Sequence, residues 1–221
     1  MPNFIHKIND SSRTNFILLA AGKNKTKGQN VAKGLTDVNG KKLIDSQISV
    51  INKTCKNKDI IYAVGDRSKS MINYMIDNHP QVRIVENTKF KTTNPLESLR
   101  MSLNCATQQD TCIIYGDKIF NKGSITFESN DSPFIVETTE CESMPLSLGL
   151  VYQKETLKNI SYGVDNAWGQ IFYIPNKLFN NFKKRINNLT RSYYNVFDFI
   201  NLIAKEYKFK IHKSKNIKEK K

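Results

Sequence analysis

The first residues in this chain that can do chemistry lie in a loop behind a short apolar segment. Residues 16–21 are apolar and lead into Gly22, and Lys33 follows after ten intervening residues. Small residues let a backbone approach a ligand closely, and the exposed N–H groups of such a loop suit an anion. A lysine adds a mobile ammonium group for phosphate oxygens. The segment therefore predicts a site for a phosphorylated ligand.

The same segment resembles the signature of a known protein family. The motifs here are Ala-Ala-Gly, then Lys33, then Gly40–Lys41. Their spacing resembles that of nucleotidyltransferases with the GT-A-like fold. The signature of that family is roughly L-A-A-G-x-G-x-R, followed by P-K-x-L and then G-K-P. Those enzymes activate sugar phosphates or phospho-alcohols with a nucleoside triphosphate. The resemblance implies that Lys33 is catalytic. It also implies that the nucleotide is bound by Ala20, Ala21, Gly22, Lys23 and Lys25.

The chain departs from that signature at four positions, which are Asn24, Thr26, Ala32 and Lys42. Asn24 stands where the family has its second glycine, and asparagine tolerates a positive φ better than most residues. Thr26 stands where the family has an arginine that grips phosphate with a bidentate fork. Neighbouring lysines can replace the charge of that arginine but not its fork.

Asp117 follows a second apolar run, Ile113–Tyr115, and Gly116. In the family, an aspartate at this place binds the magnesium that bridges the triphosphate and the acceptor phosphate. A hard carboxylate oxygen suits Mg²⁺, which usually keeps several waters. A Gly-Asp turn after a strand is common in any protein, so this interpretation depends on the preceding motif. The resemblance implies Mg²⁺ as the cofactor and Asp117 as its ligand and a catalytic residue.

The family usually has a second metal carboxylate toward the C-terminus. Asp165 and Asp198 are the candidates in this chain. Asp198 lies in an apolar helical pattern, where a capping or surface role fits equally well. The Asp-containing strand with which the family usually ends is not visible before Lys221, so both candidates stay open.

The segment Glu86–Leu99 resembles a stretch of phosphocholine-type cytidylyltransferases and MobA-like proteins that lies against the base and its ribose. The resemblance implies that Asn94 and Ser98 bind the nucleotide, one helical turn apart on the same face. Helix capping is an alternative that needs no ligand. Asn94 suits an N-cap, Pro95 the first helical position, and Glu97 a capping box.

These residues need elements to position them, and strands and helices alternate through the first half of the chain. That alternation is typical of a parallel, doubly wound sheet. We expect strands there at residues 16–21, 59–64, 81–86 and 111–115, and helices at 43–52, 68–78 and from Pro95. For the less regular second half we expect strands near 134–136, 146–152 and 169–174, helices near 176–187 and 194–205, and an edge strand at 208–211.

The expected fold is α/β, with three layers (α/β/α) and a mostly parallel, doubly wound sheet like that of nucleotide-diphospho-sugar transferases. Ligands in open α/β sheets lie outside the carboxyl ends of the strands. The Gly22 loop and Asp117 both follow such ends, so we expect them to converge.

Length and composition fit one domain, because 221 residues with 39% hydrophobic residues can bury a real core. We expect residues 1–204 to form a single nucleotidyltransferase-like domain and residues 205–221 a loose basic tail. No apolar run approaches the roughly 20 residues of a membrane helix. The start lacks the long apolar region of a signal peptide. We therefore expect a cytoplasmic protein with no membrane partner.

The cysteines and histidines exclude several other classes. Four cysteines form no C-x-x-C pair, and the three histidines lie far from them, which argues against a zinc site and a disulfide scaffold. Buried, reduced thiols are expected instead. The G-x-S-x-G, Walker A and G-x-G-x-x-G patterns are also absent.

The resemblance implies a Mg²⁺-dependent nucleotidyltransferase in which an acceptor phosphate attacks the α-phosphorus in line and pyrophosphate leaves. Its partners would be a nucleoside triphosphate and a sugar 1-phosphate or a phospho-alcohol such as phosphocholine. A catalytically degenerate, nucleotide- or partner-binding member of the fold is one alternative. The net charge of +14 motivates another, a GT-A glycosyltransferase acting on nucleic acid, but no D-x-D motif supports it. The sequence leaves the nucleobase, the acceptor and the oligomeric state open.

Overall fold

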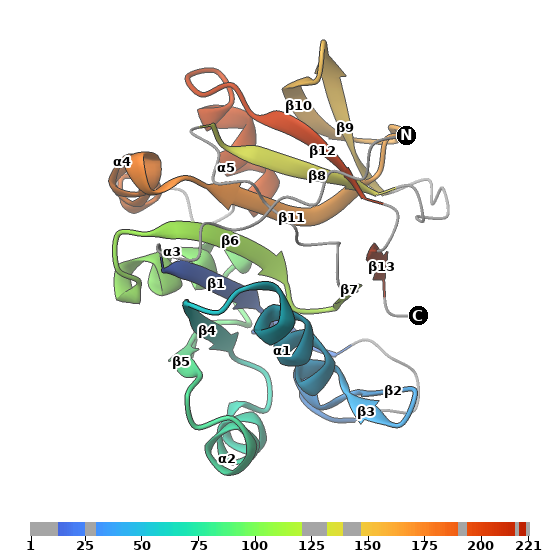
Figure 1. Cartoon of the computed structure of the whole chain (residues 1–221), viewed down its shortest axis with the longest axis vertical. Helices are drawn as coiled ribbons and strands as arrows, with labels where there is room; N and C mark the ends of the chain where they lie inside the picture. The colour runs from blue at the N-terminus through green and yellow to red at the C-terminus, as the bar shows by residue number, and fades with distance from the viewer. Residues whose placement is uncertain are drawn as a thin grey trace.

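A nine-stranded sheet organises this computed structural model, which describes residues 13–24, 30–120, 132–138, 147–189, 194–214 and 217–219 (Figure 1). The strand order is β5-β4-β1-β6-β11-β8-β12-β10-β9. The bounds are β1 Thr14–Leu19, β4 Lys58–Val64, β5 Arg83–Glu86, β6 Asp110–Tyr115, β8 Phe134–Thr138, β9 Leu148–Gln153, β10 Thr156–Tyr162, β11 Trp168–Ile174 and β12 Lys210–Ser214.

The helices are α1 Leu43–Thr54, α2 Ser68–Asn78, α3 Pro95–Cys105, α4 Asn176–Asn187 and α5 Val196–Ile203, with a 3₁₀ turn η1 at Lys33–Leu35. Two small ribbons complete the described part of the chain. One pairs β2 (Asp37–Val38) with β3 (Lys41–Lys42), and the other pairs β7 (Lys118–Phe120) with β13 (Ile217–Glu219).

Strands β5, β4, β1 and β6 form a parallel half-sheet with β1 near its centre. All six residues of β1 are buried, as expected for a strand that is covered on both faces. Leu18 pairs with Tyr62 of β4 and with Ile114 of β6. This register brings the carboxyl ends of the three strands to one edge of the sheet.

The other half of the sheet is mixed. β11 pairs antiparallel with both β6 and β8, and β10 pairs antiparallel with both β12 and β9. In the nine-stranded sheet, β11 and β10 oppose the direction of the other strands, so the expected mostly parallel sheet is confirmed. Strand β10 was not expected from the sequence. The turn that creates the β9–β10 hairpin uses Lys154 and Glu155 with positive φ, in place of the usual Asn-Gly or Asp-Gly signal.

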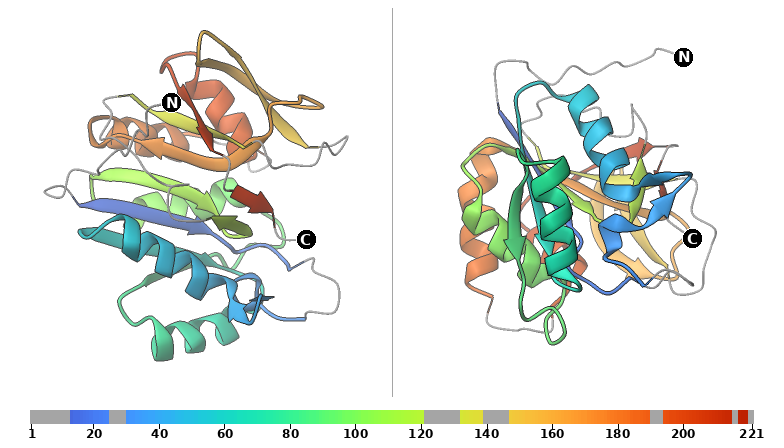
Figure 2. Two further views of the ribbon diagram at one scale, coloured as in Figure 1. Left: turned by 45° about the vertical axis from the view of Figure 1, so that its right-hand side comes forward. Right: turned by 90° about the horizontal axis from the view of Figure 1, so that it is seen from below.

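Two helical layers cover the sheet, because alternate side chains of each strand point to opposite faces. In β1, Ile17 and Leu19 pack in the cluster that contains α3, α4 and α5, whereas Phe16 and Leu18 pack in the cluster that contains α1 and α2. Figures 1 and 2 show the strands as the middle layer of this arrangement. The expected three-layer α/β/α architecture is therefore confirmed.

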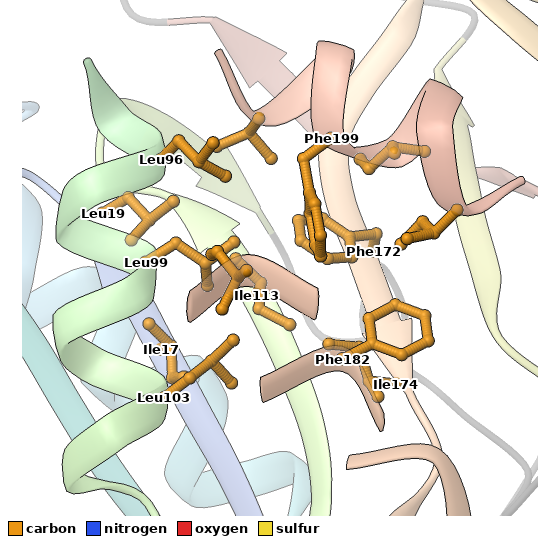
Figure 3. Close-up of a cluster of buried hydrophobic side chains, with 14 of the residues drawn as sticks. Ile17, Leu19, Leu96, Leu99, Leu103, Ile113, Phe172, Ile174, Phe182 and Phe199 are labelled. Carbon is orange, nitrogen blue, oxygen red and sulfur yellow. The ribbon is translucent and has the colours of Figure 1, made fainter. Parts of the chain in front are cut away.

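The larger core joins the two halves of the sheet. Figure 3 shows Leu99 of α3 close to Leu19 of β1, and Phe199 of α5 beside Phe172 of β11. Phe182 of α4 lies in the same cluster and meets the Phe199 ring edge to face, with centroids 6.2 Å apart. The carboxyl-terminal helices thus stabilise the same core that holds β1 and β6 in place.

The segment 205–221, expected to be a loose tail, contributes two strands instead. β12 lies inside the sheet between β8 and β10, so the expected edge strand is an interior strand. β13 pairs with β7 (Figure 1). Buried Phe209 and Ser214 flank exposed lysines at 210 and 213. Lys210 and Lys213, two of the lysines that suggested a solvated tail, therefore lie at exposed positions of a folded strand.

The cysteine prediction holds at two of three described positions. Cys55 and Cys112 are buried, and burial raises the pKa of the Cys112 thiol well above its usual range. Cys105 is exposed at the end of α3, which corrects the expectation. Cys141 lies outside the described residues. No helix in the described part of the chain has the length and apolar character needed to cross a membrane.

Candidate functional site at the carboxyl edge of the sheet

The loops after β4, β1 and β6 are tied together where these strands end. The Ala20 N–H donates to the Ala63 carbonyl (3.1 Å), the Asp66 N–H to the Ala21 carbonyl (2.9 Å), and the Gly116 N–H to the Leu19 carbonyl (2.9 Å). Because these bonds continue the sheet beyond its strands, the loop that leads to Gly22 is fixed between its two neighbours.

Ala20 and Ala21 are small because glycines pack directly against them. A Cβ at Gly116 would lie 2.8 Å from Ala20 Cα, and one at Gly65 would lie 2.9 Å from Ala21 Cβ. Both alanines are 5% exposed. They therefore shape the backbone of the loop, and their side chains are packed into the protein.

The structure brings Gly22, Lys33 and Asp117 together at this edge. The Lys33 ammonium lies 3.3 Å from Asp117 Oδ2, and a Cβ at Gly22 would lie 3.8 Å from the same ammonium. The side chains of Lys33 and Asp117 are 18% and 28% exposed, so both reach solvent. The predicted convergence of the glycine loop with the aspartate is therefore present in the geometry.

Lys33 is held by the 3₁₀ turn that it begins. The Thr36 hydroxyl donates to the Lys33 carbonyl (2.8 Å), and the Asn24 amide donates to Thr36 Oγ1 (3.0 Å). Gly34 packs on the Tyr62 ring, where a Cβ would lie 3.1 Å from Cζ. Asn24 has no positive φ, so the glycine-like conformation that asparagine tolerates is not used here. Its amide instead joins the two sides of the loop.

The remaining part of the motif, Gly40–Lys41, lies in the β2–β3 hairpin. Asn39 and Gly40 have φ of 54° and 79°, the conformation of a two-residue hairpin turn. The hairpin leads directly into α1, and the Leu43 N–H that begins this helix donates to the Thr36 carbonyl (2.9 Å). These residues therefore position α1 relative to the Lys33 turn.

The Asp117 turn is fixed by a residue that the sequence analysis missed. Gln47 of α1 donates hydrogen bonds to the carbonyl groups of Gly116 (3.3 Å) and Lys118 (2.9 Å). Its side chain is buried on the same helical stripe as Ile44 and Ile48. A polar residue on an otherwise apolar helix face was the signal that could have identified it.

Asp117 fits the carboxylate expected of a magnesium site. Its Oδ1 is buried and accepts no hydrogen bond from the residues that the structure describes. Those residues include no group of three His, Cys, Asp or Glu side chains that could hold a metal. Mg²⁺ is commonly bound by one or two carboxylates together with waters and substrate phosphates. A single carboxylate beside a phosphate-binding loop is therefore a suitable donor set.

The two candidates for a second carboxylate differ in position. Asp165 is exposed. Asp198 accepts a hydrogen bond from the Asn195 N–H (2.8 Å) and completes a capping box at the start of α5. Burial raises the pKa of Tyr115, and the charges of Asp117, Tyr162 and Asp198 raise it further. The charges of Asp117 and Asp198 therefore both act on the Tyr115 hydroxyl.

Aromatic side chains gather beyond the end of β6. The Tyr115 and Trp168 rings meet edge to face with centroids 5.6 Å apart, and the Tyr162 and Phe197 rings do the same at 5.7 Å. Trp168 is buried, whereas Tyr162 is 55% exposed. Phe197 immediately precedes Asp198 at the start of α5, so the Tyr162–Phe197 pair lies beside that helix terminus.

The remaining predicted nucleotide-binding residues differ in their accessibility. Ser98 is 2% exposed, and its hydroxyl accepts a hydrogen bond from the Asn87 amide (3.0 Å), so it anchors the loop before α3. Asn94 is half-buried at the N-cap of α3 without a side-chain cap bond. Lys23 is exposed beside Gly22, and Lys25 lies outside the described residues.

The expected capping box of α3 is absent. Glu97 pairs with Arg100, whose Nη2 lies 2.6 Å from Glu97 Oε1, and that hydrogen bond is the main cause of the lowered pKa of Glu97. Pro95 occupies the first helical position as expected.

Comparison with known proteins gives structural matches only. Neither a protein-family model nor a curated protein sequence matches the chain. A CTP:phosphocholine cytidylyltransferase from Streptococcus pneumoniae superposes with a TM-score of 0.74 at 20% identity, over 95% of this chain and 93% of that one.

Two further solved structures give similar values. An inositol-1-phosphate CTP transferase from T. maritima has a TM-score of 0.71 at 15% identity, over 94% of this chain and 87% of that one. A nucleoside-diphosphate-sugar pyrophosphorylase from Vibrio cholerae RC9 has a TM-score of 0.72 at 11% identity, over 91% and 93%. The chain therefore has the fold of the nucleotidyltransferases, as its sequence motifs predicted.

Proposed function

We propose that this chain binds a nucleoside triphosphate at Gly22, Lys33 and Asp117 and transfers the nucleoside monophosphate to a phosphorylated small molecule. The observation that carries the proposal is the 3.3 Å contact between Lys33 Nζ and Asp117 Oδ2, beside a buried Asp117 Oδ1 that has no partner among the described residues. This places a mobile cation and a hard anionic oxygen where open α/β sheets bind their ligands. The fold shared with nucleotidyltransferases supports the same reaction.

The reaction needs no nucleophile from the protein. An oxygen of the acceptor phosphate attacks the α-phosphorus, a new P–O bond forms, and the bond to the bridging oxygen breaks to release pyrophosphate. Lys33 stabilises the negative charge that develops on the phosphoryl oxygens, which is where electrostatic catalysis has its largest effect. Asp117 would hold Mg²⁺, which supplies charge neutralisation when bound.

The surroundings of Asp117 support an acceptor that carries an ammonium group. A cation is attracted to the faces of aromatic rings, and exposed Tyr162 presents such a surface next to Phe197. Asp198, which follows Phe197 in the chain, adds negative charge of the sign that an ammonium group prefers. A hexose phosphate would instead require several hydrogen-bonding groups. Among the acceptors used by the similar structures, phosphocholine has the matching chemistry.

The test is pyrophosphate release with Mg²⁺, measured for each of the four ribonucleoside triphosphates and dTTP. The acceptors to compare are phosphocholine, inositol 1-phosphate and glucose 1-phosphate. We expect release that is greatest with phosphocholine, is abolished in Asp117→Asn, and is retained in Asp77→Asn, the matched control at an exposed aspartate of α2. Nucleotide binding without turnover would favour a degenerate, binding-only member of the fold. No nucleotide binding would contradict the proposal.

A further inference from the structure

Gln47 is a buried polar residue in the core beneath the site. It is 1% exposed on α1, and its amide nitrogen donates to two carbonyl groups, those of Gly116 and Lys118. These are the carbonyl groups of the residues on either side of Asp117. One side chain therefore holds both ends of the turn that carries the carboxylate.

The same turn is held from the opposite direction by β1. The Gly116 N–H donates to the Leu19 carbonyl (2.9 Å), and a Cβ at Gly116 would lie within 2.8 Å of Ala20 Cα. The backbone at Asp117 is thus fixed between β1 and α1. Because α1 also begins on the Lys33 turn, through the Leu43 N–H and the Thr36 carbonyl, a single helix contacts both halves of the site.

The Gln47 amide combines two hydrogen bonds to the Asp117 turn with one unfavourable feature. Gln47 Oε1 is buried and has no hydrogen-bond partner among the described residues, which is unfavourable. An apolar side chain of similar size would avoid that cost while filling the same space. What an apolar side chain cannot supply is the pair of donors to the Asp117 turn.

We infer that Gln47 is a positioning residue, which sets the Asp117 carboxylate at the distance from Lys33 that the site requires. The inference rests on the proposed function, because it assigns Gln47 a role in the metal and triphosphate site. Gln47 touches the backbone of the Asp117 turn and acts through Asp117. Replacing Gln47 should therefore weaken metal binding by more than the accompanying loss of folded protein accounts for.

Asn15 provides a matched control within the same sheet. It is 0% exposed, its amide donates to the Thr107 carbonyl (2.9 Å) and Thr111 Oγ1 (3.1 Å), and its Oδ1 is also buried without a partner among the described residues. It lies at the amino end of β1, at the edge of the sheet opposite to Asp117. Replacing it removes an equivalent buried amide far from the site.

The experiment compares Gln47→Met with Asn15→Leu. Mn²⁺ binding is measured by electron paramagnetic resonance in the presence of a non-hydrolysable triphosphate analogue. We expect Gln47→Met to weaken Mn²⁺ binding about tenfold. A loss of about this size is typical when a residue that orients a metal ligand is replaced. Asn15→Leu should leave it within twofold, and Gln47→Met should have no further effect in an Asp117→Asn background. Equal Mn²⁺ affinity in Gln47→Met and the wild type would overturn the inference.

A second measurement separates this inference from the proposed function. Amide ¹H and ¹⁵N shifts of residues 116–118 in the free protein should change in Gln47→Met and stay unchanged in Asn15→Leu. Unchanged shifts in Gln47→Met would overturn the positioning role even without a ligand. If the wild type binds no Mn²⁺ with the analogue, the proposed function fails on its own. Should Gln47→Met not fold, Gln47→Asn, whose amide is one methylene shorter, carries the same predictions.

Discussion

At the scale of single residues, the site depends on an ion pair between residues 84 positions apart in the sequence, Lys33 and Asp117. We predict that Lys33→Met lowers the rate of pyrophosphate release by about 10²–10³, the effect of removing one electrostatic stabiliser. The comparison is Lys69→Met, at an exposed lysine of α2, which should keep the wild-type rate. A loss of less than threefold in Lys33→Met would show that this ammonium does not act on the reacting phosphate.

Two glycines at the site should respond differently to alanine. Gly116→Ala places a Cβ 2.8 Å from Ala20 Cα, and overpacking of this kind lowers the free energy of unfolding by about 1–3 kcal/mol. Among the described residues, a Cβ at Gly22 would meet only Lys33 Nζ, at 3.8 Å, so the free energy of unfolding of Gly22→Ala should stay within about 0.5 kcal/mol of the wild type. Urea unfolding measures both. Equal destabilisation would contradict the packing described here.

The charged residues of the candidate site could be predicted from the sequence, whereas the residues that position them could not. The Gly22 loop and Asp117 follow recognisable apolar strands, so their convergence could be expected from the fold class. Gln47 acts through backbone carbonyl groups that lie 69 and 71 residues away, and no local pattern encodes those partners. The role of Asn24 could not be predicted for the same reason, because its hydrogen bond to Thr36 joins residues that meet only when the loop closes on the 3₁₀ turn.

At the scale of elements, α1 and α2 are joined by a polar contact that should give the stability a pH dependence. The Tyr74 hydroxyl donates to Asp45 (2.7 Å), and burial followed by this hydrogen bond and the Asp45 charge raises the pKa of Tyr74 from 10.0 to about 12. The folded protein therefore holds this proton more tightly than the unfolded chain. Its contribution is complete below pH 10 and is lost as the pH rises toward 12.

The corresponding prediction concerns alkaline unfolding. Between pH 9 and 12, the free energy of unfolding should fall less steeply in Tyr74→Phe than in the wild type, as measured by urea titration at each pH. The remaining tyrosines are common to both proteins and cancel in the comparison. Identical slopes would show that the contact between α1 and α2 does not depend on the Tyr74 proton.

The last described strand, β13, should contribute to the core despite its lysine-rich neighbours. Ile217 is 2% exposed, its Cδ1 would lie 3.2 Å from a Cβ at Gly169, and its carbonyl accepts a hydrogen bond from Thr138 (3.1 Å). We predict that Ile217→Ala lowers the free energy of unfolding by about 2–5 kcal/mol, whereas exposed Lys210→Ala changes it by less than about 0.5 kcal/mol. A neutral Ile217→Ala would restore the interpretation of this segment as a tail.

The elements in the first half of the chain could be predicted because each has a clear periodicity and a clear end. α2 was expected at its observed bounds, since its apolar residues repeat at helical spacing between polar ends. β12 was misplaced because composition dominated the interpretation. Its parallel partner β8 lies about 75 residues earlier, and long-range pairing of this kind leaves no local signal.

At the scale of the whole molecule, the net charge of +14 does not by itself identify a partner. Several of the lysines that produce it lie on strands that belong to the sheet, so they cannot be removed as a tail without removing β12. The feature that distinguishes this molecule is instead the edge where three parallel strands end together. Within the described ranges, the contacts that fix Lys33 and Asp117 come from elements around that edge.

The most direct test of this account is ³¹P nuclear magnetic resonance of wild-type protein with a nucleoside triphosphate, Mg²⁺ and phosphocholine. We expect the acceptor phosphate signal to be replaced by two coupled signals of a new diphosphate diester, together with free pyrophosphate in equal amount. Asp117→Asn should show neither. Formation of nucleoside diphosphate and inorganic phosphate, with the acceptor signal unchanged, would contradict transfer to the acceptor and show that the site only hydrolyses nucleotide.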